Sequence, residues 1–144
     1  MRKNFGAKPY LYPMPVFIIA AYGEDGKANA MNAAWGGLSE ENEISVCISP
    51  DHKTTENILK SGAFTVSMAD AAHVKECDYV GVVSANKEPN KIKKTGWTVL
   101  KSEFVDAPLF EEIPMALECK LFSYDQESFR LVGEIVNVCA DERI

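Results

Sequence analysis

The chain has 144 residues, of which 47% are hydrophobic and 25% charged, a composition typical of one globular domain with a sizeable core. Its formal net charge of −6 works against a general affinity for nucleic acid or for an anionic membrane surface. No apolar run is long enough to cross a bilayer, and residues 1–8 lack the apolar stretch of a signal peptide, so we expect a cytoplasmic protein.

The cysteines and histidines are poorly spaced for a disulfide framework or a metal site. The four cysteines lie at least twenty residues apart and form no C-x-x-C pair, and the two histidines are 21 positions apart. We therefore expect reduced, buried thiols and no bound metal.

Short strands separated by turns dominate the first third of the chain. Residues 16–22 form an apolar, β-branched run that predicts a buried strand. The turn at 23–26 ends in Asp-Gly, which favours a hairpin, and predicts a second strand over 28–35. Residues 43–49 alternate apolar and polar side chains, as a half-buried strand does.

Two short helices are predicted in the middle of the chain. The first covers residues 54–62, with a threonine able to cap its N-terminus and Gly62 able to end it in a left-handed conformation. A strand follows at 64–68. The second helix runs from 70 to about 80 and begins with an acidic residue, which suits the positive end of the helix dipole.

The last third returns to strands. They are predicted over residues 97–105, 115–124 and 129–139. Six or seven strands with two short helices predict a mainly β fold, a barrel or sandwich with helical insertions. A parallel sheet is disfavoured because most connections are too short to hold a crossover helix.

Three segments are candidates for ligand binding. Residues 28–35 are small and amide-rich, so a flat ligand can approach their backbone; the alternative is a tight sheet interface with Trp35 as a core anchor. The start of the first helix combines Lys53, Thr54 and free backbone N–H groups, which suits an anion, although simple capping also explains it. Residues 87–101 hold five of the fifteen basic residues against one acid, as a solvated loop or as a contact for a ligand phosphate.

Five groups of residues, taken in chain order, carry a family resemblance. They are Pro13-x-Pro15-Val16, Asp25-Gly26-x-x-Asn29-x-Met31-x-x-x-Trp35, Ser49-Pro50 with Thr54-x-x-Asn57-Ile58, Gly62-x-Phe64-x-Val66, and Val105-Asp106-Ala107-Pro108 with Leu117-Glu118-Cys119. In this order and spacing they resemble the flavin reductase-like family, and most closely its flavoredoxin branch. The resemblance runs from near Lys8 to Glu142. It implies a split β-barrel with a Greek-key-like order, two or three short helices and bound FMN, usually as a homodimer with the flavin near the subunit interface.

The resemblance also implies which positions hold the flavin. The residues that would line the isoalloxazine ring or the ribityl chain are Asn29, Ala30, Met31, Asn32 and Trp35. Those that would surround the ribityl chain and the phosphate are Ser49, Pro50, Lys53, Thr54 and Lys91. The residues at the position of a Ser-Gly pair that contacts the cofactor are Ser84, Ala85 and Asn86.

Three features depart from the family pattern. Ala85 replaces the glycine of the Ser-Gly pair, which weakens the case for a main-chain contact there. Ser128 stands five residues before Gly133-Glu134, where the branch often has a histidine. Family members usually continue for several tens of residues beyond the position of Ile144, so we expect either a fragment or an unusually open flavin face.

The resemblance implies an FMN protein that takes a hydride from NADH or NADPH and passes electrons to free flavin, a protein partner or a small oxidant. Because the flavin carries this chemistry, no catalytic side chain is expected. The alternative is a flavoredoxin-type electron carrier reduced by a partner protein, with no nicotinamide site of its own. A third possibility is a split-barrel dimerisation or ligand-sensing module without flavin.

Overall fold

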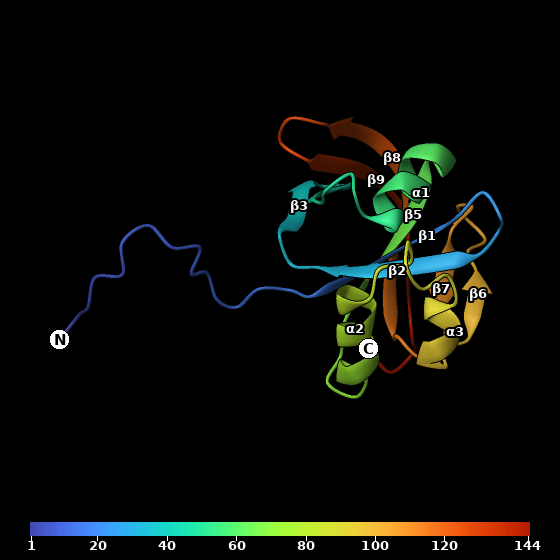
Figure 1. Ribbon diagram of the computed structural model, residues 1–144, viewed down its shortest axis with the longest axis horizontal. Coiled ribbons are helices and arrows are strands. Elements are labelled where there is room, and N and C mark those ends of the chain that lie inside the picture. The colour runs from blue at the N-terminus through green and yellow to red at the C-terminus, as the bar shows by residue number, and fades with distance from the viewer.

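Antiparallel strands make up most of the regular structure of the protein. The computed structural model describes residues 1–144. The strands are β1 (Phe17–Tyr22), β2 (Ala28–Ala33), β3 (Gly36–Glu40), β4 (Glu43–Cys47), β5 (Ala63–Met68), β6 (Val99–Lys101), β7 (Pro108–Phe110), β8 (Met115–Asp125) and β9 (Arg130–Ala140). The helices are α1 (Lys53–Ser61), α2 (Val74–Val82) and α3 (Lys91–Thr95) (Figure 1). The predicted mainly β fold with short helices is confirmed.

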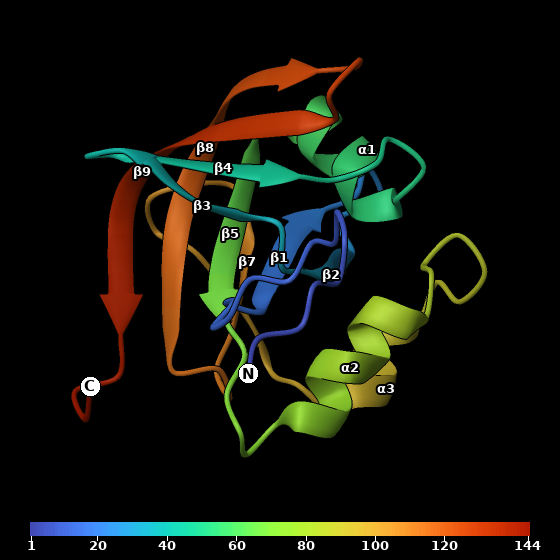
Figure 2. The ribbon, with the colours of Figure 1, turned by 90° about the vertical axis from the view of Figure 1, so that its left-hand side faces the viewer.

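Seven strands form one sheet in the order β2-β1-β5-β8-β9-β4-β3, and β6 pairs with β7 in a separate hairpin. The two outermost strands, β2 and β3, are joined by Ala34 and Trp35 alone. So short a connection reaches only roughly 11 Å between the Cα atoms that flank it. The sheet therefore curls until its two edges approach each other, which gives a half-closed barrel (Figure 2).

The main hydrophobic core fills the inside of this barrel. Ile19, Val46 and Phe64 project into it from three different strands and are fully or almost fully buried. Ile58 of α1 joins the same cluster, so the helix covers one end of the barrel. Because α1 begins near the edge strand β2, this packing fixes the helix N-terminus beside that edge.

A second core lies on the outer face of the sheet. Ile18 and Ala30, which alternate with the inward-facing residues, pack against Val80 of α2 and Ile92 of α3. The helices α2 and α3 therefore sit together beside β2 (Figure 2). Residues 1–16, by contrast, run away from the barrel and are largely exposed (Figure 1).

Several elements differ from those predicted. The strand β2 ends at Ala33, two residues earlier than expected, and β3 follows where no strand was predicted. The basic stretch contains the short helix α3, and the strand predicted over 97–105 is the shorter β6 of a hairpin. The helix α2 begins at Val74, because Asp70 Oδ1 accepts a hydrogen bond from the His73 N–H and holds the preceding residues in a turn.

The start of α1 also differs from the prediction. The helix begins at Lys53 with His52 at its N-cap position, and no side chain caps it. The predicted threonine cap is therefore wrong. The predicted helix end is confirmed, since Gly62 adopts a left-handed φ of 72° and its N–H bonds to the Ile58 carbonyl.

The cysteines, the helices and the potential metal ligands each relate to an expectation from the sequence. All four cysteines are free, and Cys77 and Cys119 are buried as expected, whereas Cys47 is exposed and Cys139 is half-buried, which corrects the expectation for these two. None of the helices combines the length and apolar character needed to cross a membrane. No group of three or more His, Cys, Asp or Glu side chains is placed to hold a metal ion.

Candidate functional site

A cavity of about 340 Å³ lies along β2, between the start of α1 and the segment that joins α2 to α3. It is lined by residues of β2, of the start of α1, of the end of α2 with the segment that follows it, and of the start of α3. These residues are Asn29, Met31, Asn32, His52, Lys53, Thr54, Val80, Gly81, Val82, Val83, Ser84, Ala85 and Lys91. Two lysines and a histidine stand among these residues, and no acid does. In a chain with a net charge of −6, so basic a cavity favours an anionic ligand.

Lys91 is the most unusual residue of the cavity. Only 3% of its surface is exposed, and its side-chain ammonium makes no hydrogen bond or ion pair with the rest of the protein. Burial lowers the pKa of its ammonium from 10.5 to about 8. A buried charge without a partner is unfavourable, so an anion bound in the cavity would supply what Lys91 lacks.

Asn29 and Thr54 meet on the opposite wall. The Asn29 Nδ2 donates a hydrogen bond to Thr54 Oγ1 at 2.8 Å, and both residues are buried. Because the Thr54 oxygen accepts this bond, its own hydroxyl hydrogen is left to donate elsewhere. The Asn29 Oδ1 atom is buried without a partner.

The first turn of α1 adds backbone donors. The first intrahelical bond runs from the Glu56 N–H to the His52 carbonyl. The N–H groups of Lys53, Thr54 and Thr55 precede this bond and have no acceptor within the helix. Since Lys53 and Thr54 line the cavity, the positive end of the helix dipole lies at its wall.

The backbone of β2 faces the cavity with unpaired groups. The Gly23 N–H donates to the Lys27 carbonyl at 2.9 Å, which marks the first hydrogen-bonded pair of the β1–β2 hairpin. Such pairs alternate along antiparallel strands, so Asn29 and Met31 bond to β1. The N–H and C=O groups of Ala30 and Asn32 therefore point away from the sheet at its open edge.

The side chains of Ala30 and Asn32 have structural roles. Ala30 belongs to the outer core, so it offers only its backbone to a ligand. The Asn32 Nδ2 donates to the Cys77 carbonyl at 3.0 Å and ties β2 to α2. Gly81 makes this approach possible, because a Cβ atom there would lie 2.0 Å from Asn32 Nδ2.

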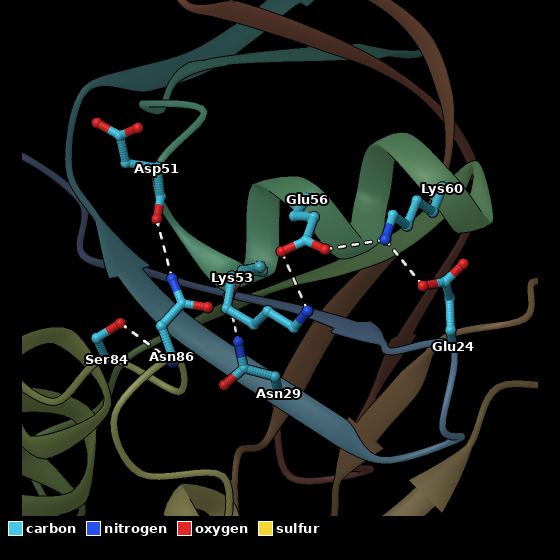
Figure 3. Close-up of polar contacts among 9 residues, drawn as sticks. Glu24, Asn29, Asp51, Lys53, Glu56, Lys60, Ser84 and Asn86 are labelled. Atoms are coloured by element: carbon cyan, nitrogen blue, oxygen red, sulfur yellow. Dashed lines mark hydrogen bonds and ion pairs between the residues drawn. The ribbon is translucent and has the colours of Figure 1, made fainter.

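A chain of ion pairs runs along α1 from the cavity. The Lys53 ammonium lies 3.1 Å from Glu56, whose other oxygen lies 2.9 Å from Lys60, and Lys60 also reaches Glu24 at 2.8 Å (Figure 3). The hydrogen bonds from Lys60 and then Lys53 lower the pKa of Glu56. The side chains of these ion pairs are 35–75% exposed, so the pairs contribute little to the stability of the protein. Their effect is to hold the Lys53 ammonium in position.

The loops on both sides of the cavity are joined. The Asn86 Nδ2 donates to the main-chain carbonyl of Asp51 at 3.2 Å (Figure 3). The Asn86 N–H in turn donates to Ser84 Oγ at 3.3 Å. The segment after α2 is thereby held against the segment before α1.

The structure brings together eight of the thirteen residues predicted to bind the flavin. These are Asn29, Met31, Asn32, Lys53, Thr54, Ser84, Ala85 and Lys91. Ala30 and Asn86 are chain neighbours of lining residues but are not themselves part of the lining. Residues from separate parts of the chain thus line one cavity, and their binding of flavin stays a prediction.

Three predicted residues lie outside the cavity. Trp35 follows the end of β2, is 63% exposed and lines a different cavity with residues of the N-terminal arm. It therefore anchors no core, which corrects that interpretation, and its contact with the flavin stays a prediction. Ser49 interacts with Asp51 instead, and Pro50 is exposed.

The prediction missed the wall formed by residues 80–83 and the side chain of His52. Gly81, between two valines near a helix end, was the available signal, since a glycine within a helix often marks a close approach. Its partner Asn32 is far away in the sequence, so the contact itself has no local signature.

Comparisons with known proteins agree with the fold. Residues 10–143 match the model of the flavin reductase like domain family, and the chain belongs to this family. It is similar to an uncharacterised protein of Aeropyrum pernix, at 31% identity over 114 residues that cover 77% of this chain and 43% of the relative. The chain spans between 43% and 64% of the length of the curated relatives it matches.

Two solved structures of flavoredoxins are also similar. That of Desulfovibrio vulgaris (Miyazaki F) has a TM-score of 0.94 and 36% identity, covering 99% of this chain and 78% of that chain. That of Methanosarcina acetivorans has a TM-score of 0.85 and 28% identity, covering 99% of this chain and 76% of that chain. The resemblance predicted from the sequence motifs is thus confirmed.

Proposed function

We propose that the protein binds FMN at the β2 cavity and acts as a flavin reductase-like oxidoreductase, with NADH or NADPH as its reductant. The observation that carries the proposal is Lys91, a buried ammonium without a partner in a cavity that no acid lines. The phosphate of FMN is an anion of suitable charge to pair with it.

Different groups of the protein would bind different parts of FMN. Lys91, the Thr54 hydroxyl and the free N–H groups at the start of α1 would hold the phosphate, with Lys53 beside them. The outward N–H and C=O groups of β2 would meet the polar parts of the ribityl chain and the ring. Met31, Val82 and Val83 give the cavity apolar surface for the remainder of the ligand.

The bound flavin supplies hydride acceptance and electron transfer. The protein's contribution is position and electrostatics, so no side chain has to move a proton. This division suits a cavity that holds lysines, amides and hydroxyls but no carboxylate.

A second candidate is an FMN electron carrier that a partner protein reduces. The likeness to two flavoredoxins, at 36% and 28% identity, favours it. In this case FMN binds in the same way, but NADH and NADPH do not reduce it.

The two candidates are separated by a visible spectrum of the purified protein with FMN, recorded before and after anaerobic addition of NADH and then NADPH. Bleaching of the bound flavin by either nucleotide supports the reductase. Bleaching by dithionite alone supports the electron carrier, and failure to bind FMN contradicts both.

Two further parts of the proposal follow from the family and the composition. We expect a homodimer, which light scattering at micromolar concentration tests, a monomer being the contradicting result. We also expect a cytoplasmic location, because all four cysteines are free.

A further inference from the structure

The N-terminal arm, residues 1–16, leaves the barrel and exposes large apolar side chains. Every residue of the arm except Met14 is exposed. Four large apolar residues are 58–83% exposed: Phe5, Tyr10, Leu11 and Tyr12. Because the arm runs away from the barrel (Figure 1), the barrel leaves these side chains uncovered. Exposed apolar side chains gathered in one segment mark a site of contact with another molecule.

The arm holds part of its shape by itself. The Phe5 ring packs edge-on against Tyr10, with 5.9 Å between the ring centroids, and the Lys3 ammonium lies 5.7 Å from the Phe5 centroid. Gly6 turns the chain between the two rings with a left-handed φ of 71°. Three prolines further restrict the backbone of the arm. Binding of the arm therefore costs less conformational entropy than binding of a fully flexible segment would.

The arm and the rest of the chain carry opposite charges. The arm contains Arg2, Lys3 and Lys8 but no acidic residue, so the rest of the chain holds twelve basic and twenty-one acidic residues, a net charge of −9. Lys8 is exposed and forms no ion pair within its own chain. The barrel of a second copy is thus complementary in charge to the arm.

A cavity of about 550 Å³ lies at the base of the arm, between the end of β5 and α2. Val16, Met68 and Val74 give it apolar surface. Its only charged residues are Asp70 and Asp78. The Asp78 carboxylate has no partner, and Asp70 uses only its Oδ1 atom as an acceptor. The cavity therefore combines apolar surface with carboxylate oxygens that are free to pair with a cation.

We propose that the arm of one copy docks in this cavity of a second copy, whose own arm docks in the first. The aromatic pair of Phe5 and Tyr10 packs on the apolar part, and the Lys8 ammonium pairs with Asp78. Since the cavity lies at the base of the arm, two arms that run antiparallel bring each tip to the base of the other, and the contact closes as a two-fold dimer. The inference goes beyond the proposed function, because neither the arm nor Asp78 lines the β2 cavity.

Cross-linking tests the contact directly. Ordinary and isotope-labelled full-length protein are unfolded together in urea, refolded as a mixture and treated with a carbodiimide, which joins lysine amines to adjacent carboxylates. Mass spectrometry should find Lys8 joined to Asp78 in peptides that combine one labelled and one ordinary chain. Links within one isotope only would mean that each arm folds back on its own barrel, and absence of the link would mean that the arm docks elsewhere; either result overturns the inference.

Sedimentation velocity over a concentration series tests the aromatic anchors in the flavin-free protein. Phe5→Ser combined with Tyr10→Ser should raise the dissociation constant of the dimer by at least about tenfold, because two buried aromatic contacts are lost. Phe104→Ser is the matched control, since Phe104 is 57% exposed and lies in neither the arm nor the cavity. It should leave the dissociation constant unchanged, and an effect as large as that of the arm variant overturns the inference.

A charge swap tests the ion pair. Asp78→Lys should weaken the dimer by roughly three- to tenfold, and Lys8→Asp in the same chain should restore most of the loss. Glu103→Lys makes the same change of charge at an exposed position outside the cavity and should have no such effect. A loss that Lys8→Asp does not restore contradicts the docking of the arm at Asp78.

The outcomes separate this inference from the proposed function. A wild-type protein that stays monomeric at micromolar concentration overturns the docking of the arm, and titration of that monomer with FMN still tests the role of Lys91. A dimer that cross-links as expected but binds no FMN overturns the proposed function alone.

Discussion

The Asn29 amide and the Thr54 hydroxyl join the edge strand β2 to the first turn of α1 through a buried hydrogen bond of 2.8 Å. This bond fixes the distance between the two elements that carry most of the polar groups of the cavity. Thr54 thereby has two roles, as the partner of Asn29 and as a hydroxyl donor to a ligand.

Thr54→Val removes the hydroxyl but keeps the volume of the side chain, so it tests the two hydrogen-bonding roles of Thr54 apart from its packing. Valine keeps the shape but leaves the Asn29 amide unpaired, so the free energy of unfolding should fall by about 1 to 3 kcal/mol. FMN affinity should fall as well. Urea denaturation and flavin titration measure the two effects.

Thr55→Val is the matched control for this substitution. Thr55 is equally buried, but its Oγ1 atom has no hydrogen-bond partner. Removal of that hydroxyl should leave stability unchanged or raise it, and FMN affinity should stay the same. A loss of stability as large as that of Thr54→Val would contradict the role of the Asn29–Thr54 bond.

Lys91→Met should change stability and binding in opposite directions. Methionine fills a similar volume without a buried charge, so the flavin-free protein should gain about 1 to 3 kcal/mol in the free energy of unfolding. The same substitution should abolish tight FMN binding. Lys93→Met, at an exposed lysine of the same helix, should change stability by less than about 0.5 kcal/mol.

The lowered pKa of Lys91 predicts a pH dependence of stability. Between the folded pKa of about 8 and the ordinary value of 10.5, the unfolded chain binds more protons than the folded protein. Stability therefore rises with pH across this window, and the destabilising effect of Lys91 is fully present below pH 8.

The difference in unfolding free energy between Lys91→Met and wild type isolates this effect from other titrating groups. Without flavin, it should shrink between pH 7 and pH 10, as urea denaturation at both values can show. A difference that stays constant would mean that Lys91 keeps its ordinary pKa.

Gly81→Ala should disturb the junction of α2 with β2. The new Cβ would lie 2.0 Å from Asn32 Nδ2 and displace the amide from the Cys77 carbonyl. We expect a loss of about 1 to 3 kcal/mol in thermal or urea unfolding. Gly37→Ala, where no atom lies within 4 Å of the new Cβ, should be nearly neutral, and equal losses in both variants would contradict the close approach at Gly81.

The sequence predicts those elements whose signal is local. The apolar run of β1, the alternation of β4 and the left-handed Gly62 at the end of α1 all lie within one short window, and all three are confirmed. The strand β3 escaped prediction because Gly36 and Gly37 carry no apolar alternation, and its pairing with β4 decides its conformation.

The sequence predicts only those residues of the candidate site that belong to a recognisable motif. Thr54 and Lys91, which the resemblance relates to a phosphate site, line one cavity, and their binding of a phosphate stays a prediction. Trp35 lies beyond the end of β2 rather than within the predicted strand, because the chain turns there to the far edge of the sheet. The contact of Asn32 with Gly81 depends on the packing of α2 and could not be read from either segment alone.

In the proposed function, Lys91 binds the phosphate of FMN. This role can be measured by titration of wild type and Lys91→Met with FMN, and with riboflavin as the matched ligand without phosphate. Wild type should bind FMN more tightly than riboflavin, and Lys91→Met should lose most of this preference while its riboflavin affinity stays close to that of wild type. A Lys91→Met protein that still prefers FMN as strongly as wild type would contradict the account.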